Sequence, residues 1–262
     1  MATKYEEAAF LNDNDAFETL TLDEAINCIS TDQNSYYQRY DGRLYCPECH
    51  TPHIGIVNRD GNYFFRAYPG SEHTPTCFYG FEPISSNTFQ EYVLREENHD
   101  ELNGKLQRFV YRLLNRGNID LHNLLLHVQN DRCTSNNTNL VNIRNRREIR
   151  RIPTKSISAP FNNDDLNCYM LFYGKVDVRY SIKGSGANAF HKIYCYKRDR
   201  NELLCSLSFS RNVAVHLENN YNLIPDEKKS NMCVAFYSEM KRNGQFLNAR
   251  LTHSKLFFMD SQ

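Results

Sequence analysis

The sequence contains no long apolar segment. No stretch of its 262 residues approaches the ~18 consecutive apolar residues that a membrane-spanning helix needs. The first residues also lack the basic stretch followed by an apolar one that marks a secretory leader. These absences predict a soluble, cytoplasmic protein without a membrane partner, whose length suffices for one large or two modest domains.

The sequence also lacks the signatures of a phosphate-binding loop and of a catalytic triad. The glycine-containing stretch at residues 183–186 lacks the rest of a phosphate-binding loop and indicates a turn between strands. No grouping typical of a catalytic triad is formed by the histidines at positions 122, 127, 191, 216 and 253. Neither of these signatures therefore indicates catalysis.

The chain has no net charge, but its charges are unevenly placed. It contains 31 basic and 31 acidic residues. Residues 1–120 carry 10 Lys and Arg against 19 Asp and Glu, a net charge of −9, and residues 121–262 carry 21 against 12, a net charge of +9. A polyanion is expected to meet the C-terminal half. The opposite charges of the two halves are also compatible with a partner protein or a homodimer.

Three of the nine cysteines form a metal-binding pattern with one histidine. Cys46-Pro47-Glu48-Cys49 supplies two thiolates from a tight turn, and His73 and Cys77 supply an imidazole and a third thiolate. Three sulfur ligands and one nitrogen ligand suit tetrahedral Zn²⁺. The spacing therefore predicts a structural zinc ion, with His50 and His53 as alternative ligands next to the first pair.

The other six cysteines are expected to be reduced. Most of them lie in apolar stretches of the sequence. Buried free thiols explain this placement better than a disulfide framework does. These residues are Cys28, Cys133, Cys168, Cys195, Cys205 and Cys233.

Local patterns in the first 80 residues predict a strand, a helix and a hairpin. Residues 8–11 indicate a short strand. Thr21, with Glu24 three residues later, predicts a capping box at the start of a helix. Residues 53–57 and 62–68 indicate two strands that turn at Arg59-Asp60-Gly61 and return the chain to the predicted metal.

The middle of the chain is predicted to be helical and then polar. Apolar residues recur every three or four positions at residues 88–116, and a second, leucine-rich helix is predicted at residues 121–128. Residues 1–128 are thus expected to form a zinc-binding module with a helical segment. Residues 129–166 are poor in apolar side chains and predict a basic polar linker. The linker is either an arm that binds phosphates or a solvated tether. Its basic side chains include Arg144, Arg146, Arg147, Arg150, Arg151 and Lys155.

The last part of the chain, residues 167–262, predicts a β-barrel domain. Apolar and polar residues alternate along a long first strand, and further strands are indicated, the last pair joined through Arg242-Asn243-Gly244. A stretch of weak helical character separates the third and fourth strands. Three strands, an intervening segment and a two-strand return are the order of an OB barrel, so the fold class is expected to be α+β. The expected strands cover residues 176–182, 193–196, 203–209, 232–240 and 246–258.

The first part of the chain resembles a known family. Glu7-Ala8-Ala9-Phe10, the helix after it, Tyr45-Cys46-Pro47-Glu48-Cys49 and the aromatic ribbon that leads to His73 and Cys77 are together similar to the N-terminal zinc module of competence protein CoiA-like families. The resemblance covers about the first 80 residues. It implies zinc binding and the handling of incoming or mobile DNA. The nuclease pattern that follows the module in those families is not found after residue 120, so the resemblance does not imply catalysis.

The C-terminal half offers candidate contacts to a nucleic acid. Basic side chains and tyrosines alternate along its predicted strands, and OB folds hold single strands with a positive groove and aromatic stacking platforms. We therefore expect a non-catalytic nucleic-acid-binding protein, with single-stranded DNA as the first ligand, in bacterial or mobile-element DNA processing or defence. The candidate contact residues are Arg179, Lys192, Tyr194, Tyr196, Lys197, Arg198 and Arg242.

Two alternative functions are also compatible with the sequence. Asp226, Glu239 and Lys241 satisfy the literal spacing of metal-dependent nucleases, in which two carboxylates hold Mg²⁺ and a lysine activates the attacking water. The expected strand after Lys241 argues against that fold, which has a helix there. The other alternative is an adaptor whose barrel binds a partner protein.

Overall fold

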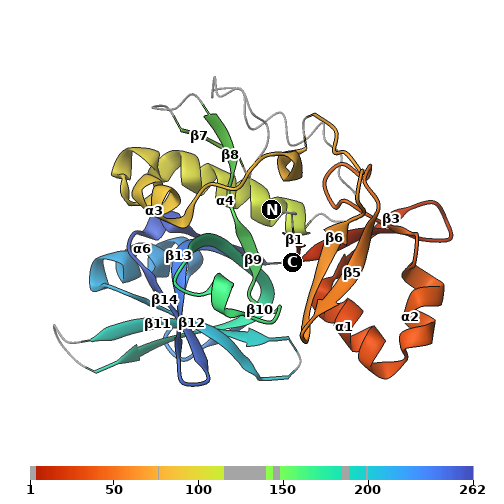
Figure 1. Cartoon of the computed structure of the whole chain (residues 1–262). Helices are drawn as coiled ribbons and strands as arrows, with labels where there is room; N and C mark the ends of the chain where they lie inside the picture. Colours follow the sequence, from red (N-terminus) through yellow and green to blue (C-terminus); the bar gives the residue numbers. More distant parts are fainter. Residues whose placement is uncertain are drawn as a thin grey trace. The chain divides into compact units, whose positions relative to one another are not determined.

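The computed structural model describes residues 4–75, 77–114, 140–143, 148–184, 189–198 and 200–261. Contacts group them into two compact units, one within Met1–Pro83 and Arg116–Arg151 and the other within Ile84–Asn115 and Ile152–Gln262. The elements of each unit are coloured along the chain in Figure 1. The predicted helix at residues 121–128, Cys133 and the predicted arginines 144, 146 and 147 lie outside the described residues.

The N-terminal unit contains small sheets, two helices and a β-hairpin. One sheet has the order β1-β6-β5 and another the order β3-β2-β4, while β7 and β8 pair with each other. The apolar core of the unit includes Tyr5, Phe10, Phe65 and Phe78, all of them buried. Its elements are β1 Lys4–Tyr5, β2 Glu7–Leu11, β3 Phe17–Thr21, α1 Leu22–Thr31, α2 Gln33–Tyr40, β4 Leu44–Tyr45, β5 Ile54–Arg59, β6 Asn62–Ala67, β7 Leu140–Ile143 and β8 Glu148–Arg151.

Local sequence signals determine how these elements begin and turn. The side chain of Thr21 accepts a hydrogen bond from the Glu24 amide, and the Glu24 carboxylate accepts one from the Thr21 amide, which confirms the capping box at α1. The predicted hairpin is also confirmed. Its turn places Asp60 at φ 54° and Gly61 at φ 82°, conformations that aspartate and glycine tolerate.

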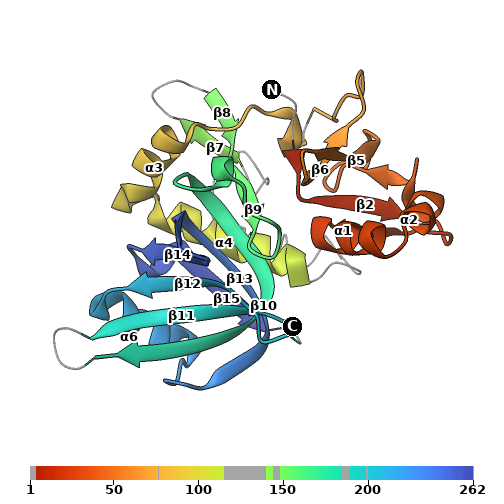
Figure 2. The same ribbon diagram turned by 60° about the horizontal axis from the view of Figure 1, so that its bottom comes forward.

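The second unit is built around a closed five-stranded barrel. Neighbouring strands pair in the order β10-β11-β12-β14-β13, and β13 pairs again with β10, which closes the ring. All pairs are antiparallel except β12 with β14, which is parallel. The predicted five-stranded barrel is thereby confirmed (Figure 2). The barrel strands are β10 Tyr169–Lys183, β11 Phe190–Lys197, β12 Leu203–Phe209, β13 Lys228–Asn243 and β14 Phe246–Leu251, with α6 Arg211–Tyr221 between β12 and β13.

The predicted last strand, residues 246–258, is divided in the structure. β14 ends at Leu251, a 3₁₀ turn covers Ser254–Leu256, and β15 Phe257–Ser261 follows. The break has a local cause, because Nδ1 of His253 accepts a hydrogen bond from the Lys255 amide and caps the turn. β15 then pairs with β13, beyond the segment that pairs with β14.

The boundary between the units differs from the predicted one at residue 128. The helices α3 Ser86–Leu94 and α4 His99–Leu114 belong to the barrel unit, where α4 packs against β13 and β15. The physical reason is the apolar face of α4, whose Leu102, Leu106 and Phe109 are fully buried. The predicted linker also contains ordered structure, since β8 pairs with β7 and β9 Thr154–Ser156 pairs with β10.

Gly174 occupies a position on β10 where no side chain fits. A Cβ at Gly174 would lie 2.6 Å from Cγ1 of Ile157, whose backbone amide donates to the carbonyl of Tyr173. We expect Gly174→Ala to lower the free energy of unfolding by about 1–3 kcal/mol through overpacking. The matched control is Gly104→Ala on α4, where a Cβ would meet only Nη1 of Arg108 at 3.9 Å. It should raise stability by roughly 0.5–1 kcal/mol, and urea unfolding of both variants tests the pair.

A buried polar chain joins the barrel wall to α6. The Tyr180 hydroxyl donates to Glu218 at 2.5 Å, and Nδ1 of His191 lies 2.6 Å from the same hydroxyl. His191 is fully buried, and no described residue hydrogen-bonds its Nε2. Burial, aided by Arg211, lowers the pKa of His191, so the ring is neutral in the folded protein.

This arrangement predicts a pH-dependent stability. Below the ordinary histidine pKa of about 6.5, the unfolded chain takes up a proton that folded His191 does not, so stability is present above that pH and falls as the pH decreases. Wild type should lose up to about 1.4 kcal/mol per pH unit more than His191→Gln, which cannot titrate. Urea unfolding between pH 7.5 and pH 5 tests this, with about equal slopes for the two proteins as the contrary result.

Candidate functional site

Cys46, Cys49, His73 and Cys77 meet in the N-terminal unit. Their ligand atoms all lie within 4.8 Å of one another. The Sγ atoms of Cys46 and Cys77 are 3.7 Å apart, and Nδ1 of His73 lies 3.5 Å from the Cys49 sulfur and 3.3 Å from the Cys77 sulfur. One metal ion placed among these atoms would contact all of them, so the cluster can bind a metal ion.

The first pair of ligands lies in a tight turn after β4. The Cys46 carbonyl accepts a hydrogen bond from the His50 amide at 3.0 Å, and His50 has φ 52°. The Cys46 amide donates to the carbonyl of Pro52 at 2.9 Å, which closes the turn. These backbone bonds hold both thiols on the same side of the turn. The amides of Glu48 and Cys49 also point at the Cys46 sulfur.

The second pair comes from the segment after β6. The Cys77 amide donates to the carbonyl of Thr74 at 3.0 Å, and a 3₁₀ turn at Phe78–Gly80 follows directly. The Tyr79 amide donates to the Cys77 sulfur. Cys46 and Cys77 are buried, whereas Cys49 and His73 are half-buried. The cluster is therefore largely shielded from water and continuous with the apolar core.

Tyr5 orients the histidine of the cluster. Its hydroxyl lies 2.8 Å from Nε2 of His73, and its side chain is buried on β1. Because Nδ1 of His73 faces the sulfurs, the proton of the ring resides on Nε2 and is donated to the Tyr5 oxygen. Metal-binding histidines characteristically donate their second ring nitrogen in this way. Sequence reasoning missed Tyr5, because no pattern links positions separated by 68 residues.

The protonation of the two buried thiols is strongly unequal. A hydrogen bond from Cys46 lowers the pKa of Cys77, and the Tyr79 amide acts in the same direction. The same hydrogen bond, together with burial, raises the pKa of Cys46. Two thiolates so close together repel each other unless a cation lies between them.

The alternative histidine ligands point elsewhere. The ring of His50 stacks on Phe17 with a centroid distance of 4.0 Å. His53 packs against Tyr45 at 4.2 Å. Both side chains are exposed, and neither belongs to the group of four ligands.

A second candidate site is the outer face of the barrel around β11. In antiparallel pairs, directly opposite residues project to the same face. Arg179 on β10 is opposite Tyr194, and Tyr194 is opposite Ser206 on β12. The rings of Tyr194 and Tyr196 lie side by side, with centroids 6.5 Å apart. We call this surface the β11 face; it comprises Asp177, Arg179, Ser181, Lys183, Phe190, Lys192, Tyr194, Tyr196, Ser206, Ser208, Asn248 and Arg250.

Two aromatic residues of this part of the barrel were missed by sequence reasoning. Phe190, at the start of β11, has an exposed fraction of 65%, and Phe246, at the start of β14, one of 48%. Phe190 shares the alternation of Lys192 and Tyr194 and therefore projects from the β11 face. From the sequence alone, a phenylalanine in a strand is expected to lie in the apolar core. Only the pairing register shows that its side chain points outward.

The remaining predicted contact residues are not on the β11 face. Lys197 ends β11, and Arg198 follows it. Burial raises the pKa of the nearby Asp177 carboxyl, but hydrogen bonds from Lys228 and the Asn231 amide outweigh burial and lower that pKa, and the charge of Arg198 adds to their effect. Arg242 donates from Nη2 to the carbonyl of Phe161 at 3.1 Å. It pairs with Leu247 and so projects to the opposite side of the hairpin from Asn248.

The structure does not bring the nuclease-like residues together. Asp226 precedes β13 and lies 3.5 Å from Arg179, whereas Glu239 is near the other end of β13, opposite Tyr169. At ~3.3 Å per residue the two carboxylates are on the order of 30 Å apart along the strand, too far to share one Mg²⁺. Glu239 forms an ion pair with Lys241 at 3.0 Å. These three residues form no metal-dependent catalytic site.

No protein-family model, curated protein or solved structure matches the chain. Among the described residues, no helix is both long and apolar enough to cross a membrane.

Proposed function

We propose that the Cys46, Cys49, His73 and Cys77 cluster binds Zn²⁺ as a structural ion. Zinc bond lengths of ~2.3 Å to sulfur and ~2.0–2.1 Å to nitrogen give tetrahedral edges of ~3.8 Å between two sulfurs and ~3.6 Å between sulfur and nitrogen. The separations of 3.7, 3.5 and 3.3 Å fit those edges. Four protein ligands complete the tetrahedron, so the ion would have no open position for catalysis.

We also propose that the barrel is an OB fold. In chain order its strands are numbered one to five, and their neighbours around the ring follow the order 1-2-3-5-4-1. The parallel pair between the third and fifth strands and the helix between the third and fourth support this assignment. OB folds bind oligonucleotides on the face of the second and third strands, which here are β11 and β12.

The function that follows is non-catalytic binding of a nucleic acid, with single-stranded DNA as the ligand. The observation that carries it is the β11 face, where Phe190, Tyr194 and Tyr196 accompany Lys192 and Arg179 on one surface. Bases stack on aromatic rings regardless of sequence, and cations follow the phosphates. The CoiA-like resemblance of the first 80 residues supports a role in bacterial or mobile-element DNA processing or defence, in the cytoplasm where free thiols persist.

The salt dependence of binding tests this function. Fluorescence anisotropy with a labelled dT oligonucleotide at several salt concentrations should give a linear fall of log K with log salt, with a slope of about −0.7 per phosphate contact. Lys192→Ala should reduce the magnitude of that slope by about 0.7. Arg242→Ala is the matched control and should leave the slope unchanged, because Arg242 projects away from the β11 face.

Absence of binding at low salt would remove the proposal and favour a protein-binding adaptor. An equal effect of Lys192→Ala and Arg242→Ala on the slope would show that nucleic acid is bound by diffuse charge rather than by the β11 face. Tighter binding to a duplex than to the single strand would likewise contradict the assigned ligand.

A further inference from the structure

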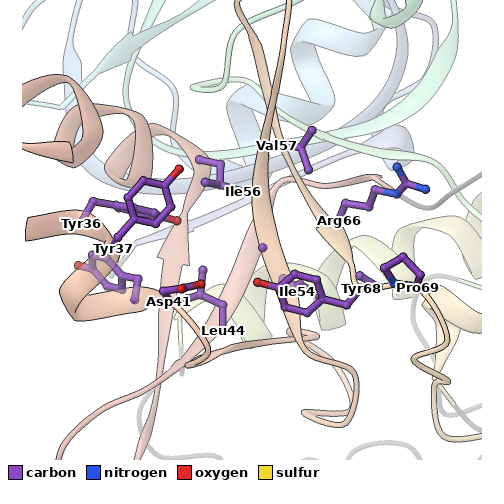
Figure 3. Close-up of a pocket in the computed structure, with 13 residues that line it drawn as sticks. Tyr36, Tyr37, Asp41, Leu44, Ile54, Ile56, Val57, Arg66, Tyr68 and Pro69 are labelled. Carbon is purple, nitrogen blue, oxygen red and sulfur yellow. The ribbon is translucent and has the colours of Figure 1, made fainter. Parts of the chain in front are cut away.

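The N-terminal unit contains a pocket lined by tyrosines. Its volume is about 210 Å³, and it lies between α2 and the β5–β6 hairpin. Tyr36 and Tyr37 line it from α2, and Tyr68 lines it from the segment after β6 (Figure 3). Tyr40 on α2 lines it as well. Apolar side chains, Ile54 among them, complete the wall. Four aromatic rings around so small a space favour a flat aromatic ligand.

The backbone of β5 leaves room for the Tyr68 ring. A Cβ at Gly55 would lie 3.0 Å from the Tyr68 hydroxyl oxygen and 3.3 Å from its ring carbon. Glycine therefore lets this ring lie directly against the strand. Tyr37 and Tyr68 expose 44% and 45% of their surfaces. Both rings are available to a ligand that enters from solvent.

Polar groups are placed at two ends of the pocket. Asp41 accepts a hydrogen bond from the Tyr68 hydroxyl, which points toward it in Figure 3. The Tyr36 side chain is 2% exposed, and no described residue hydrogen-bonds its hydroxyl. Burial, and then the neighbouring phenols, raise the pKa of Tyr36, so this hydroxyl keeps its proton. Arg66 lines the pocket as well and points away from Asp41.

We propose that this pocket binds a guanine nucleotide. Proteins that read single bases stack them on aromatic rings and hydrogen-bond their Watson–Crick edge. Guanine presents two adjacent N–H donors on that edge, which a carboxylate such as Asp41 accepts together. The Arg66 guanidinium, which also lines the pocket, offers charge-assisted bonds to the phosphate. A purely cationic ligand fits less well, because Arg66 would repel it.

The pocket and the β11 face belong to different units. Nucleotide binding in the pocket is therefore distinct from oligonucleotide binding by the β11 face, and either activity can be absent without the other. Loss of mononucleotide binding would leave oligonucleotide binding by the barrel unaffected, and Lys192→Ala should not alter affinity for a mononucleotide.

Calorimetric titration of the full-length protein with nucleoside monophosphates tests the assignment. GMP should bind saturably and at least 10-fold more tightly than AMP, CMP or UMP. Asp41→Asn should weaken GMP binding at least 10-fold, and Tyr68→Ala by a similar factor through lost stacking. The matched control is Asp60→Asn in the exposed β5–β6 turn of the same unit, where asparagine also tolerates the positive φ. It should leave GMP binding unchanged.

Further measurements show whether the ligand is a free nucleotide or a base within a nucleic-acid chain. Guanosine should bind more weakly than GMP in wild type, and Arg66→Ala should abolish that difference. A dG-containing trinucleotide that binds more tightly than GMP would identify the base as part of a chain; the opposite order would identify a free nucleotide. No saturable GMP binding, equal affinity for the four monophosphates, or equal losses in Asp41→Asn and Asp60→Asn would overturn the proposal.

Discussion

Cys77→Ser is expected to abolish binding of the proposed zinc ion and to unfold the N-terminal unit. Cys77 contributes one of the four ligands and is itself buried in the core that contains Phe78 and Cys46. Structural zinc sites in small domains have apparent binding free energies of ~10–16 kcal/mol, comparable with the whole stability of a domain at ~5–15 kcal/mol. Metal analysis should give one zinc per chain for wild type and much less for the variant. Its thermal unfolding should lose the transition of this unit.

Cys28→Ser is the control for that experiment. Cys28 lies on α1, packs against the same core and is not a ligand. It should retain one zinc per chain, with a stability loss of roughly 1 kcal/mol. A strong chelator should reproduce the Cys77→Ser result in wild type. A metal-free wild-type protein with a fully folded N-terminal unit would contradict the structural role of the ion.

The double variant Tyr194→Ala, Tyr196→Ala is expected to lose most of its affinity for single-stranded DNA. Stacking of a base on an aromatic ring contributes about 1–3 kcal/mol, which is about 5- to 150-fold in the dissociation constant for each ring. The two rings are neighbours on β11, so successive bases of one strand can stack on them. Anisotropy measurements at fixed salt should show a loss of at least about 25-fold for the pair.

Two comparisons make this result specific. Tyr194→Phe keeps the ring and should keep nearly all the affinity. Tyr111→Ala removes an exposed tyrosine on α4, which packs against Phe258 in the same unit, and should not change binding. If Tyr111→Ala weakens binding as much as the double variant does, the loss reflects stability and not stacking on the β11 face.

Several features of this protein were predictable because they depend on residues close in sequence. Thr21 and Glu24 cap α1 through bonds that span three positions, and Asp60 and Gly61 turn a hairpin through their own backbone preferences. The Cys46-Pro47-Glu48-Cys49 turn belongs to the same class. The alternation of apolar and polar residues likewise indicated the barrel strands, because one face of each strand is buried.

Other features depend on contacts between distant segments, which only the tertiary structure decides. The apolar face of α4 is equally compatible with either unit, and its packing on β13 and β15 is what assigns it to the barrel. The strand register turns Phe190 outward, and the length of β13 separates Asp226 from Glu239. The bond from Tyr5 to His73 joins residues that no local pattern relates. The sequence alone thus determined turns, caps and ligand spacing, whose energies are local. Tertiary structure decided which surfaces meet, because hydrophobic burial is non-directional and an apolar stripe does not specify its partner.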